Sequence, residues 1–75
     1  MKLSQTSKDF IEKYVLHQMG VTNVTDDNIS NIVDFIVDNY EIPLAQAKEN
    51  GERIDENLLD LAASVVTEIT TNPDW

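Results

Sequence analysis

The stretch from Thr25 to Tyr40 constrains the fold most, because its apolar residues recur with the period of an α-helix. At about 100° per residue, one arc collects the apolar side chains of Ile29, Ile32, Val33, Ile36, Val37 and Tyr40. The opposite arc collects the acidic side chains of Asp27, Asp34, Asp38 and Glu41. Its Val, Ile and Phe residues would also suit a strand, but 16 residues exceed the usual strand length. We therefore predict an amphipathic helix over this stretch.

The residues before this helix form a start signal. Thr25 is a favourable N-cap, and Asp26 and Asp27 place negative charge in the first turn, where the helix dipole favours it. Val24 and Ile29 have the spacing of a hydrophobic staple. The start signal and the apolar arc therefore agree.

A first helix is predicted from about Ser7 to Met19, and Gly20 is expected to end it. Thr6 and Asp9 approximate a capping box, and Ser4 and Ser7 are alternative caps. The connection over 20–24 is short, and short connections favour antiparallel neighbours. We therefore expect the first two helices to form a hairpin.

Two further helices are predicted after Tyr40. Pro43 is expected to end the second helix and to start a short third one over about 43–50, which Gly51 closes. A last helix is predicted over about 56–71, with Asp55 as its N-cap. Asn72 and Pro73 are expected to terminate it, leaving a short tail.

These elements predict an all-α fold, a small bundle of three main helices plus one short helix. The 75 residues are expected to form a single domain, with a lead-in over 1–5, the helical bundle over 6–71 and a C-terminal tail over 72–75. The predicted core consists of Phe10, Tyr14, Ile29, Ile32, Val33, Ile36, Leu58, Leu61, Val65 and Ile69.

Charge and composition exclude several classes of function. Fourteen Asp and Glu residues against five Lys and Arg give a net charge of −9, which disfavours direct binding to nucleic acid. The chain has no Cys, so disulfides, thiolate metal sites and thiol catalysis are excluded. No apolar run has the length of a membrane span, and the N-terminus lacks the apolar segment of a signal peptide. We expect a soluble cytoplasmic protein that does not bind membranes.

Candidate catalytic and metal-binding groups are few. His17 is the single histidine, and no recognisable motif supplies partners for it. Asp34 and Asp38 lie one turn apart but opposite the apolar arc, where two solvated carboxylates would hold a cation weakly. Residues 26–28 lack the alternating ligands, the Gly and the closing Glu of an EF-hand loop. We predict no enzymatic activity, no cofactor and no metal.

Small size, acidity and helix order superficially resemble those of acyl carrier proteins, which carry a prosthetic group on the Ser of a D-S-L motif at the start of their second helix. This chain has no D-S-L, and the nearest hydroxyl residues are Thr25 in T-D-D and Ser30 in I-S-N. The resemblance covers composition and helix order only, so we do not assign the chain to this family. A carrier or accessory protein modified on Ser30 or another hydroxyl is kept as the alternative function.

The leading interpretation is a non-enzymatic protein-protein interaction module whose partner has a basic surface. A helix-turn-helix over the first two helices is rejected, because its recognition helix would present carboxylates to DNA. A more specific form of the hypothesis is that the acidic residues mimic nucleic acid and bind a protein that normally binds nucleic acid. The simplest alternative is that the acidic residues only keep the protein soluble. The candidate partner-binding residues are Asp27, Asp34, Phe35, Asp38 and Glu41.

Some apolar residues exceed what one core needs. Leu59, Ala63 and Val66 widen the apolar arc of the last helix, so we expect either a partner or homodimer surface there, or cover by the short third helix. Trp75 is a weaker candidate anchor for a partner.

Overall fold

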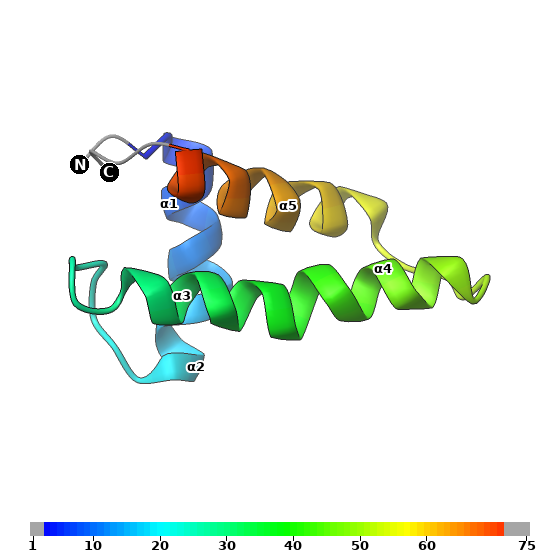
Figure 1. Ribbon diagram of the computed structural model, residues 1–75, viewed down its shortest axis with the longest axis horizontal. Coiled ribbons are helices and arrows are strands. Elements are labelled where there is room, and N and C mark those ends of the chain that lie inside the picture. The colour runs from blue at the N-terminus through cyan, green and yellow to red at the C-terminus, as the bar shows by residue number, and fades with distance from the viewer. Residues whose placement is uncertain (1–2, 72–75) are drawn as a thin grey trace.

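The computed structural model describes residues 3–71, and this part of the chain is all-α. Three continuous helical stretches follow one another (Figure 1). The first comprises α1 (Gln5–Ile11), the π-helical segment η1 (Glu12–Leu16) and α2 (His17–Met19). The second comprises α3 (Ile29–Ile36), the π-helical segment η2 (Val37–Glu41) and α4 (Ile42–Glu49), and the third is α5 (Glu56–Thr71). The predicted fold class is confirmed.

The three stretches are arranged as a helical hairpin with one helix across it. The long helix over 29–49 and α5 run side by side in opposite directions, and α1 crosses them (Figure 1). α1 packs against α5, and η1 packs against α3. The prediction that the first two helices form the hairpin is therefore wrong. Because the buried residues Phe10, Ile11 and Val15 span a wide arc, this helix contacts both partners by crossing them.

The first helix begins two residues earlier than predicted and ends where predicted. Ser4 is its N-cap, with its Oγ accepting a hydrogen bond from the backbone N–H of Ser7. Gly20 follows the last turn at φ 73°, and the N–H groups of Gly20 and Val21 donate to the carbonyls of His17 and Leu16. These two bonds form a Schellman motif, which needs the left-handed conformation that glycine adopts without strain.

The start of α3 uses the predicted cap but begins later. Thr25 Oγ1 accepts from the N–H of Asn28 at 3.3 Å, and Asn28 Oδ1 accepts from the N–H of Thr25 at 2.8 Å. This reciprocal pair is a capping box in which Asn takes the place of Glu or Gln. Residues 26–28 form the turn that it closes, so regular α-helix begins at Ile29.

The predicted short helix exists as α4, but Pro43 does not separate it from α3. The N–H of Ile42 donates to the carbonyl of Val37, five residues earlier, within a π-helical turn. Pro43 has no N–H, and in a regular α-helix its ring would crowd the carbonyl four residues before it. The wider π turn gives that carbonyl room, so the helix continues without a break.

Gly51 ends the long helix at φ 76°, again with a Schellman motif, in which Gly51 and Glu52 donate to the carbonyls of Lys48 and Ala47. Asp55 then caps α5, because its Oδ1 accepts from the N–H of Leu58 at 3.1 Å. Both predicted signals are confirmed. The predicted stop at Asn72 and Pro73 lies outside the described residues.

The core lies where the three stretches meet. Its buried apolar residues are Leu3, Phe10, Ile11, Val15, Ile29, Ile32, Ile36, Ala62, Val65 and Ile69. Four predicted core residues are half-buried at its margin, namely Tyr14, Val33, Leu58 and Leu61. Leu3 was expected in the lead-in, but it is only 5% exposed and belongs to the core. Among the described residues, no helix combines the length and the apolarity needed to cross a bilayer.

Candidate functional site

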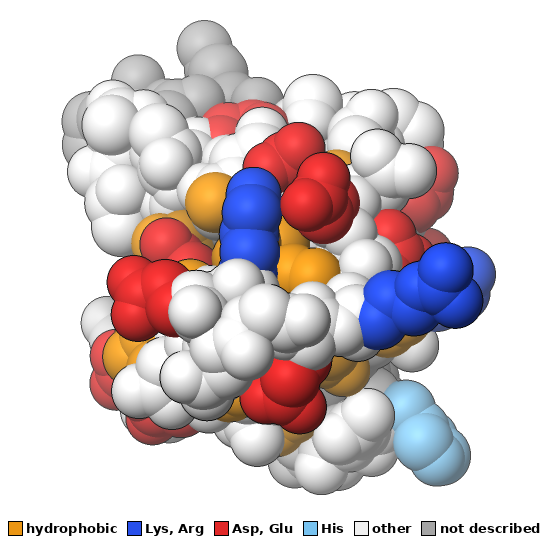
Figure 2. All heavy atoms as spheres, turned by 90° about the vertical axis from the view of Figure 1, so that its right-hand side faces the viewer, with side chains coloured by type: hydrophobic (Ala, Val, Ile, Leu, Met, Phe, Trp, Pro, Cys, Tyr) orange, Lys and Arg blue, Asp and Glu red, His pale blue; other side chains and the backbone are white. Residues whose placement is uncertain are grey.

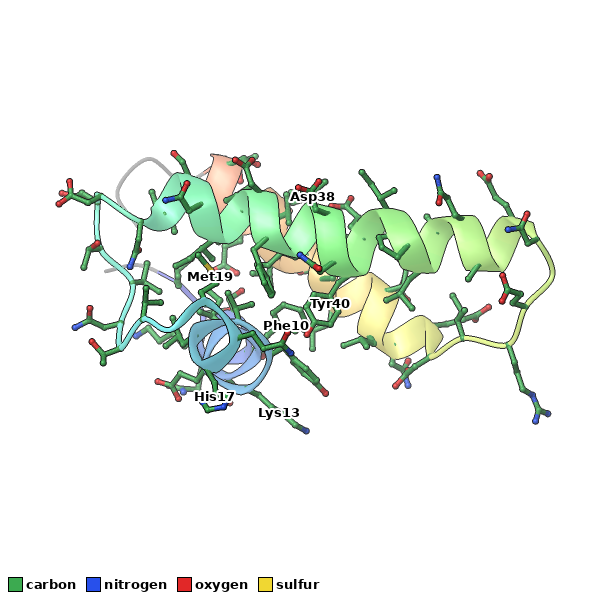
Figure 3. The ribbon with its side chains drawn as sticks, turned by 90° about the horizontal axis from the view of Figure 1, so that it is seen from below. Phe10, Lys13, His17, Met19, Asp38 and Tyr40 are labelled. Atoms are coloured by element: carbon green, nitrogen blue, oxygen red, sulfur yellow. The ribbon has the colours of Figure 1, made fainter. Side chains whose placement is uncertain are left out.

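Opposite sides of the molecule carry different charged side chains. Asp38, on the long helix over 29–49, points away from the first helix (Figure 3). Lys13 and His17, on the first helix, point in the opposite direction (Figure 3). The crossing helix therefore leaves one face of the hairpin uncovered, and the acidic side chain of Asp38 lies on that side.

The structure places three of the five candidate residues in solvent. Asp27 lies in the turn before α3, Asp34 in α3 and Asp38 in η2, and all three are exposed. Asp34 and Asp38 are separated by one helical turn on the outer side of the long helix, as predicted.

Glu41 differs from these three because it is half-buried. The π turn has more residues per turn than an α-helix, so each residue after it is rotated less than the 100° wheel assumes. Glu41 is thereby turned toward the core side, and Ile42 takes the outer position that follows Asp38. Ile42 is 46% exposed and is the large apolar side chain that the described part of the chain leaves most open to solvent.

Phe35, the fifth candidate, is half-buried and packs against the core. Its ring centroid is 6.3 Å from that of Tyr40, whose ring also contacts Phe10 and Tyr14 at centroid distances of 5.7 and 5.8 Å. Phe35 thus belongs to an aromatic cluster at the crossing of the helices and is partly exposed.

A groove lies between α3 and α5 next to the acidic side chains. Its volume is about 280 Å³, and it is lined by Ile29, Ser30, Val33, Asp34, Ile69 and Thr70. Asp34 is the charged residue in this lining. Sequence reasoning missed the groove, because it pairs residues about 40 positions apart and no local pattern reports that pairing.

The apolar residues that widen α5 are half-buried. Leu59, Ala63 and Val66 are neither fully covered nor fully exposed. α4 continues the long helix instead of folding over α5 (Figure 1). α4 approaches only the start of α5, where Lys48 pairs with Glu56, so it does not cover all three residues.

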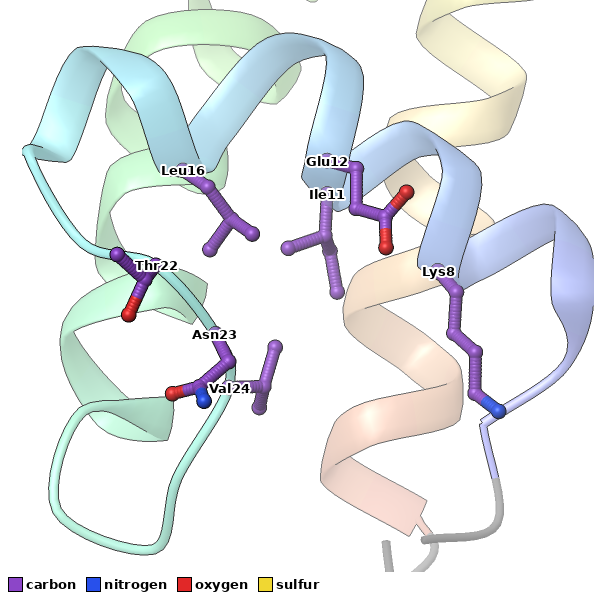
Figure 4. A pocket seen from close by; sticks show the side chains of 7 residues that line it. All are labelled: Lys8, Ile11, Glu12, Leu16, Thr22, Asn23 and Val24. Atoms are coloured by element: carbon purple, nitrogen blue, oxygen red, sulfur yellow. The ribbon is translucent and has the colours of Figure 1, made fainter.

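A second pocket of about 150 Å³ lies between the first helix and the following loop (Figure 4). Ile11, Leu16 and Val24 supply its apolar walls, and Lys8 and Glu12 lie toward its edge (Figure 4). Leu16 is half-buried and packs against the core as well as lining this pocket.

The end of the molecule formed by α4 and the start of α5 carries both signs of charge. Lys, Arg, Asp and Glu side chains surround a small apolar area there (Figure 2). Lys48 Nζ lies 3.7 Å from Glu56 Oε1, and both side chains are more than half exposed. Such an exposed pair contributes about 0–1 kcal/mol. This end therefore lacks the uniform acidity of the outer side of α3.

Glu68 joins α5 to the start of α1. Its carboxylate accepts hydrogen bonds from the backbone N–H of Ser4, from Ser4 Oγ at 3.0 Å and from Ser7 Oγ at 2.7 Å. The backbone bond from Ser4, followed by the bond from the Ser7 hydroxyl, lowers the pKa of Glu68 below its ordinary value. A carboxylate with a lowered pKa is a weak general base, so the cluster is unsuited to proton abstraction. Its hydrogen bonds instead hold α5 against the start of α1, and we call the cluster the Glu68 clamp. No local pattern indicates this cluster, because its members lie more than 60 positions apart in the chain.

The part of the chain that the structure describes contains no group of three or more His, Asp or Glu side chains placed to hold a metal ion. His17 is exposed on the first helix. Trp75, the weaker candidate anchor, lies outside the described residues.

Comparisons with known proteins found no match. This holds for known protein families, for curated proteins and for solved structures. The functional argument therefore starts from the geometry described above.

Proposed function

We propose that this chain is a non-enzymatic protein-binding module whose acidic face contacts a basic surface of another protein. The observation that carries the proposal is the exposure of Asp27, in the turn before α3, and of Asp34 and Asp38 on the long helix, which has no Lys or Arg before Lys48. Lys13 and His17 point away from this face (Figure 3). The basic groups of the first helix thus lie away from Asp38, an arrangement that general solubility does not require.

A basic partner would gain from this arrangement in two ways. Like charges one helical turn apart repel by a few tenths of a kcal/mol, and a cation between them replaces that repulsion with attraction. The field of the uncovered face also steers a basic surface toward it and speeds encounter. Both effects are screened by salt, so affinity is expected to fall as ionic strength rises.

Mimicry of nucleic acid is the sharper form of the same proposal. A protein that normally binds phosphates presents Lys and Arg side chains, and a row of carboxylates offers them an alternative ligand. The net charge of −9 fits such a role, since it keeps the chain itself away from nucleic acid.

The test neutralises Asp27, Asp34 and Asp38 together as Asn. Binding to the partner recovered from the native host by pull-down is then measured across a salt series. Weaker binding with a flatter salt dependence is expected. Unchanged affinity and an unchanged salt slope would overturn the proposal.

A matched control removes the same number of charges elsewhere. Glu12, Glu49 and Glu52 are exposed and lie outside α3 and η2, and their replacement by Gln leaves an equal net charge. If this control weakens binding as much as the first variant, only total charge matters and the acidic face has no special role.

A second candidate function is a carrier or accessory protein modified on a hydroxyl. Ser30 favours it, because this residue is exposed, lies in the first turn of α3 and lines the groove. Mass spectrometry of protein from the native host tests the idea. An added mass that disappears in Ser30→Ala supports a carrier, and the bare chain mass excludes it.

A further inference from the structure

The groove between α3 and α5 has an apolar floor and a polar rim. Ile29 and Ile69 are buried and Val33 is half-buried, whereas Ser30, Asp34 and Thr70 are exposed. Its volume of about 280 Å³ lies just under the roughly 300–1,000 Å³ of small-molecule sites. The groove is therefore suited to one large apolar side chain of a partner.

The lining extends beyond the groove along both helices. Val37 follows Val33 by four residues, and Val66 precedes Thr70 by four, so each lies one turn further on the same side of its helix. Both residues are half-buried. Together with the groove, Val37 and Val66 form an apolar strip that runs along both helices of the hairpin, and we call it the α3–α5 strip. Asp34 and Asp38 lie along one edge of this strip.

The chemistry of the strip narrows the kind of segment that fits. An added β-strand needs an exposed sheet edge, and the described residues 3–71 contain no strand. A polyproline segment needs a groove lined by aromatic side chains, and none lines this groove. An amphipathic helix needs a long apolar strip, with anchors one turn apart.

Charge favours a different protein over a second copy of this chain as the occupant of the strip. Two copies facing each other through this strip would bring together two chains with a net charge of −9 each, and neither α3 nor α5 has a Lys or Arg to pair with Asp34 and Asp38. A helix with Lys or Arg beside its apolar anchors would instead place cations against those carboxylates.

We propose that the partner segment is a basic amphipathic α-helix that lies along the α3–α5 strip and inserts an apolar anchor between Val33 and Ile69. This inference rests on the proposed function, because it names the partner of the same acidic face. The Lys and Arg residues of the segment contact Asp34 and Asp38, and its apolar residues displace water from the groove.

The probe is a synthetic peptide of about 15 residues, in which Leu recurs with helical spacing and Lys fills the other positions. A scrambled peptide of the same composition has equal charge but no apolar face. We expect the full chain to bind the patterned peptide at least about tenfold more tightly. Equal affinity for both peptides would overturn the inference.

Two variants locate the binding site. Ser30→Trp places a bulky side chain at the rim of the groove and is expected to weaken binding of the patterned peptide about tenfold. Ser64→Trp is the control, because Ser64 is exposed on α5 and does not line the groove. Equal effects of the two substitutions would overturn the inference.

The charge variants separate this inference from the proposed function. If Asp34→Asn with Asp38→Asn weakens binding of both peptides equally and Ser30→Trp has no effect, the acidic face binds cations but the groove does not bind a helix. If this double variant changes the binding of neither peptide, the proposed function fails as well.

Other occupants of the groove give other results. Dimerisation in sedimentation experiments that Ser30→Trp abolishes would assign the groove to a second copy. Tighter peptide binding by Trp75→Ala would assign it to the C-terminal end of the same chain. Either result overturns the inference, whereas a monomer whose peptide affinity is unchanged by Trp75→Ala supports it.

Discussion

The hydroxyl of Tyr40 donates a 3.1 Å hydrogen bond to the backbone carbonyl of Tyr14. This bond joins the two π-helical segments, since Tyr14 lies in η1 and Tyr40 in η2. The two rings also contact each other at a centroid distance of 5.8 Å. One side chain thus fixes the crossing point of the first helix on the long helix by both a polar and an aromatic contact.

Tyr40→Phe removes the hydrogen bond and keeps the ring. We expect a loss of about 0.5–1.5 kcal/mol in the free energy of unfolding, measured by urea denaturation. Gln18→Ala is the control, because its amide is 3.5 Å from the same hydroxyl and should contribute little. Equal stability of Tyr40→Phe and the native chain would show that the bond does not hold the crossing.

Ile36→Ala tests the centre of the core. Ile36 is 0% exposed, so the substitution leaves a cavity and is expected to cost about 2–5 kcal/mol. A domain of this size has a small reserve of stability, and thermal unfolding should show a large drop in Tm. Ile42→Ala makes the same change on the surface and should cost much less; similar losses would contradict the assigned burial.

Asp34→Ala tests the acidic face without a partner. The substitution relieves repulsion from Asp38, so stability should be unchanged or higher by a few tenths of a kcal/mol. Asp34 makes no salt bridge within residues 3–71. A clear loss of stability in chemical denaturation would mean that Asp34 has a structural role in the fold.

The Glu68 clamp predicts a dependence of stability on pH. Its pKa is lowered in the folded state relative to an ordinary value of 4.5, so the clamp stabilises the fold fully above that pH. This contribution is lost as the pH falls below about 4.5 and through the lowered pKa of the folded state.

Denaturation curves of the native chain and Glu68→Gln, taken from neutral to acidic pH, measure this effect. The native chain should be more stable at neutral pH, and the difference should shrink as the carboxyl is protonated. Asp60→Asn, on an exposed position of α5, controls for the loss of one charge. A difference that is independent of pH would contradict the clamp.

Gly20→Ala tests the end of the first helix. Space is available, because a Cβ at Gly20 would meet no atom within 4 Å, but its φ of 73° is unfavourable for residues with a side chain. We expect a cost of about 1–2 kcal/mol, and a smaller cost for Gly20→Asn, since Asn tolerates this conformation better. Thermal unfolding of the two variants measures the difference, and equal costs would point to another cause.

The sequence predicted those parts of the fold that depend on neighbouring residues. The apolar period over 29–36, the cap at Thr25 and the stop at Gly20 each involve residues within a few positions of one another. Such signals act through local backbone hydrogen bonds, so they persist whatever the rest of the chain does. The all-α fold class and several helix ends could therefore be predicted from these local signals.

The features that were missed depend on tertiary packing. The crossing of the first helix, the burial of Leu3 and the clamp at Glu68 each require segments far apart in the chain to meet. Pro43 was predicted to end the second helix, because proline usually breaks a helix. The helix continues through Pro43 because of the π turn before it, which no local pattern indicates. The groove was missed because it is shared by α3 and α5.

The π turn at 37–41 means that the long helix contains one residue more than its core contacts need. Removing a residue from an ordinary helix rotates everything beyond it by about 100° and exposes its buried side. Removing Asn39, which is exposed, would instead convert the π turn into a regular turn. Leu44 would then keep its alignment with Ile36. That regular turn would, however, bring the carbonyl four residues before Pro43 back against its ring. The extra residue is therefore what allows a single helix to run from Ile29 to Glu49 with a proline inside it.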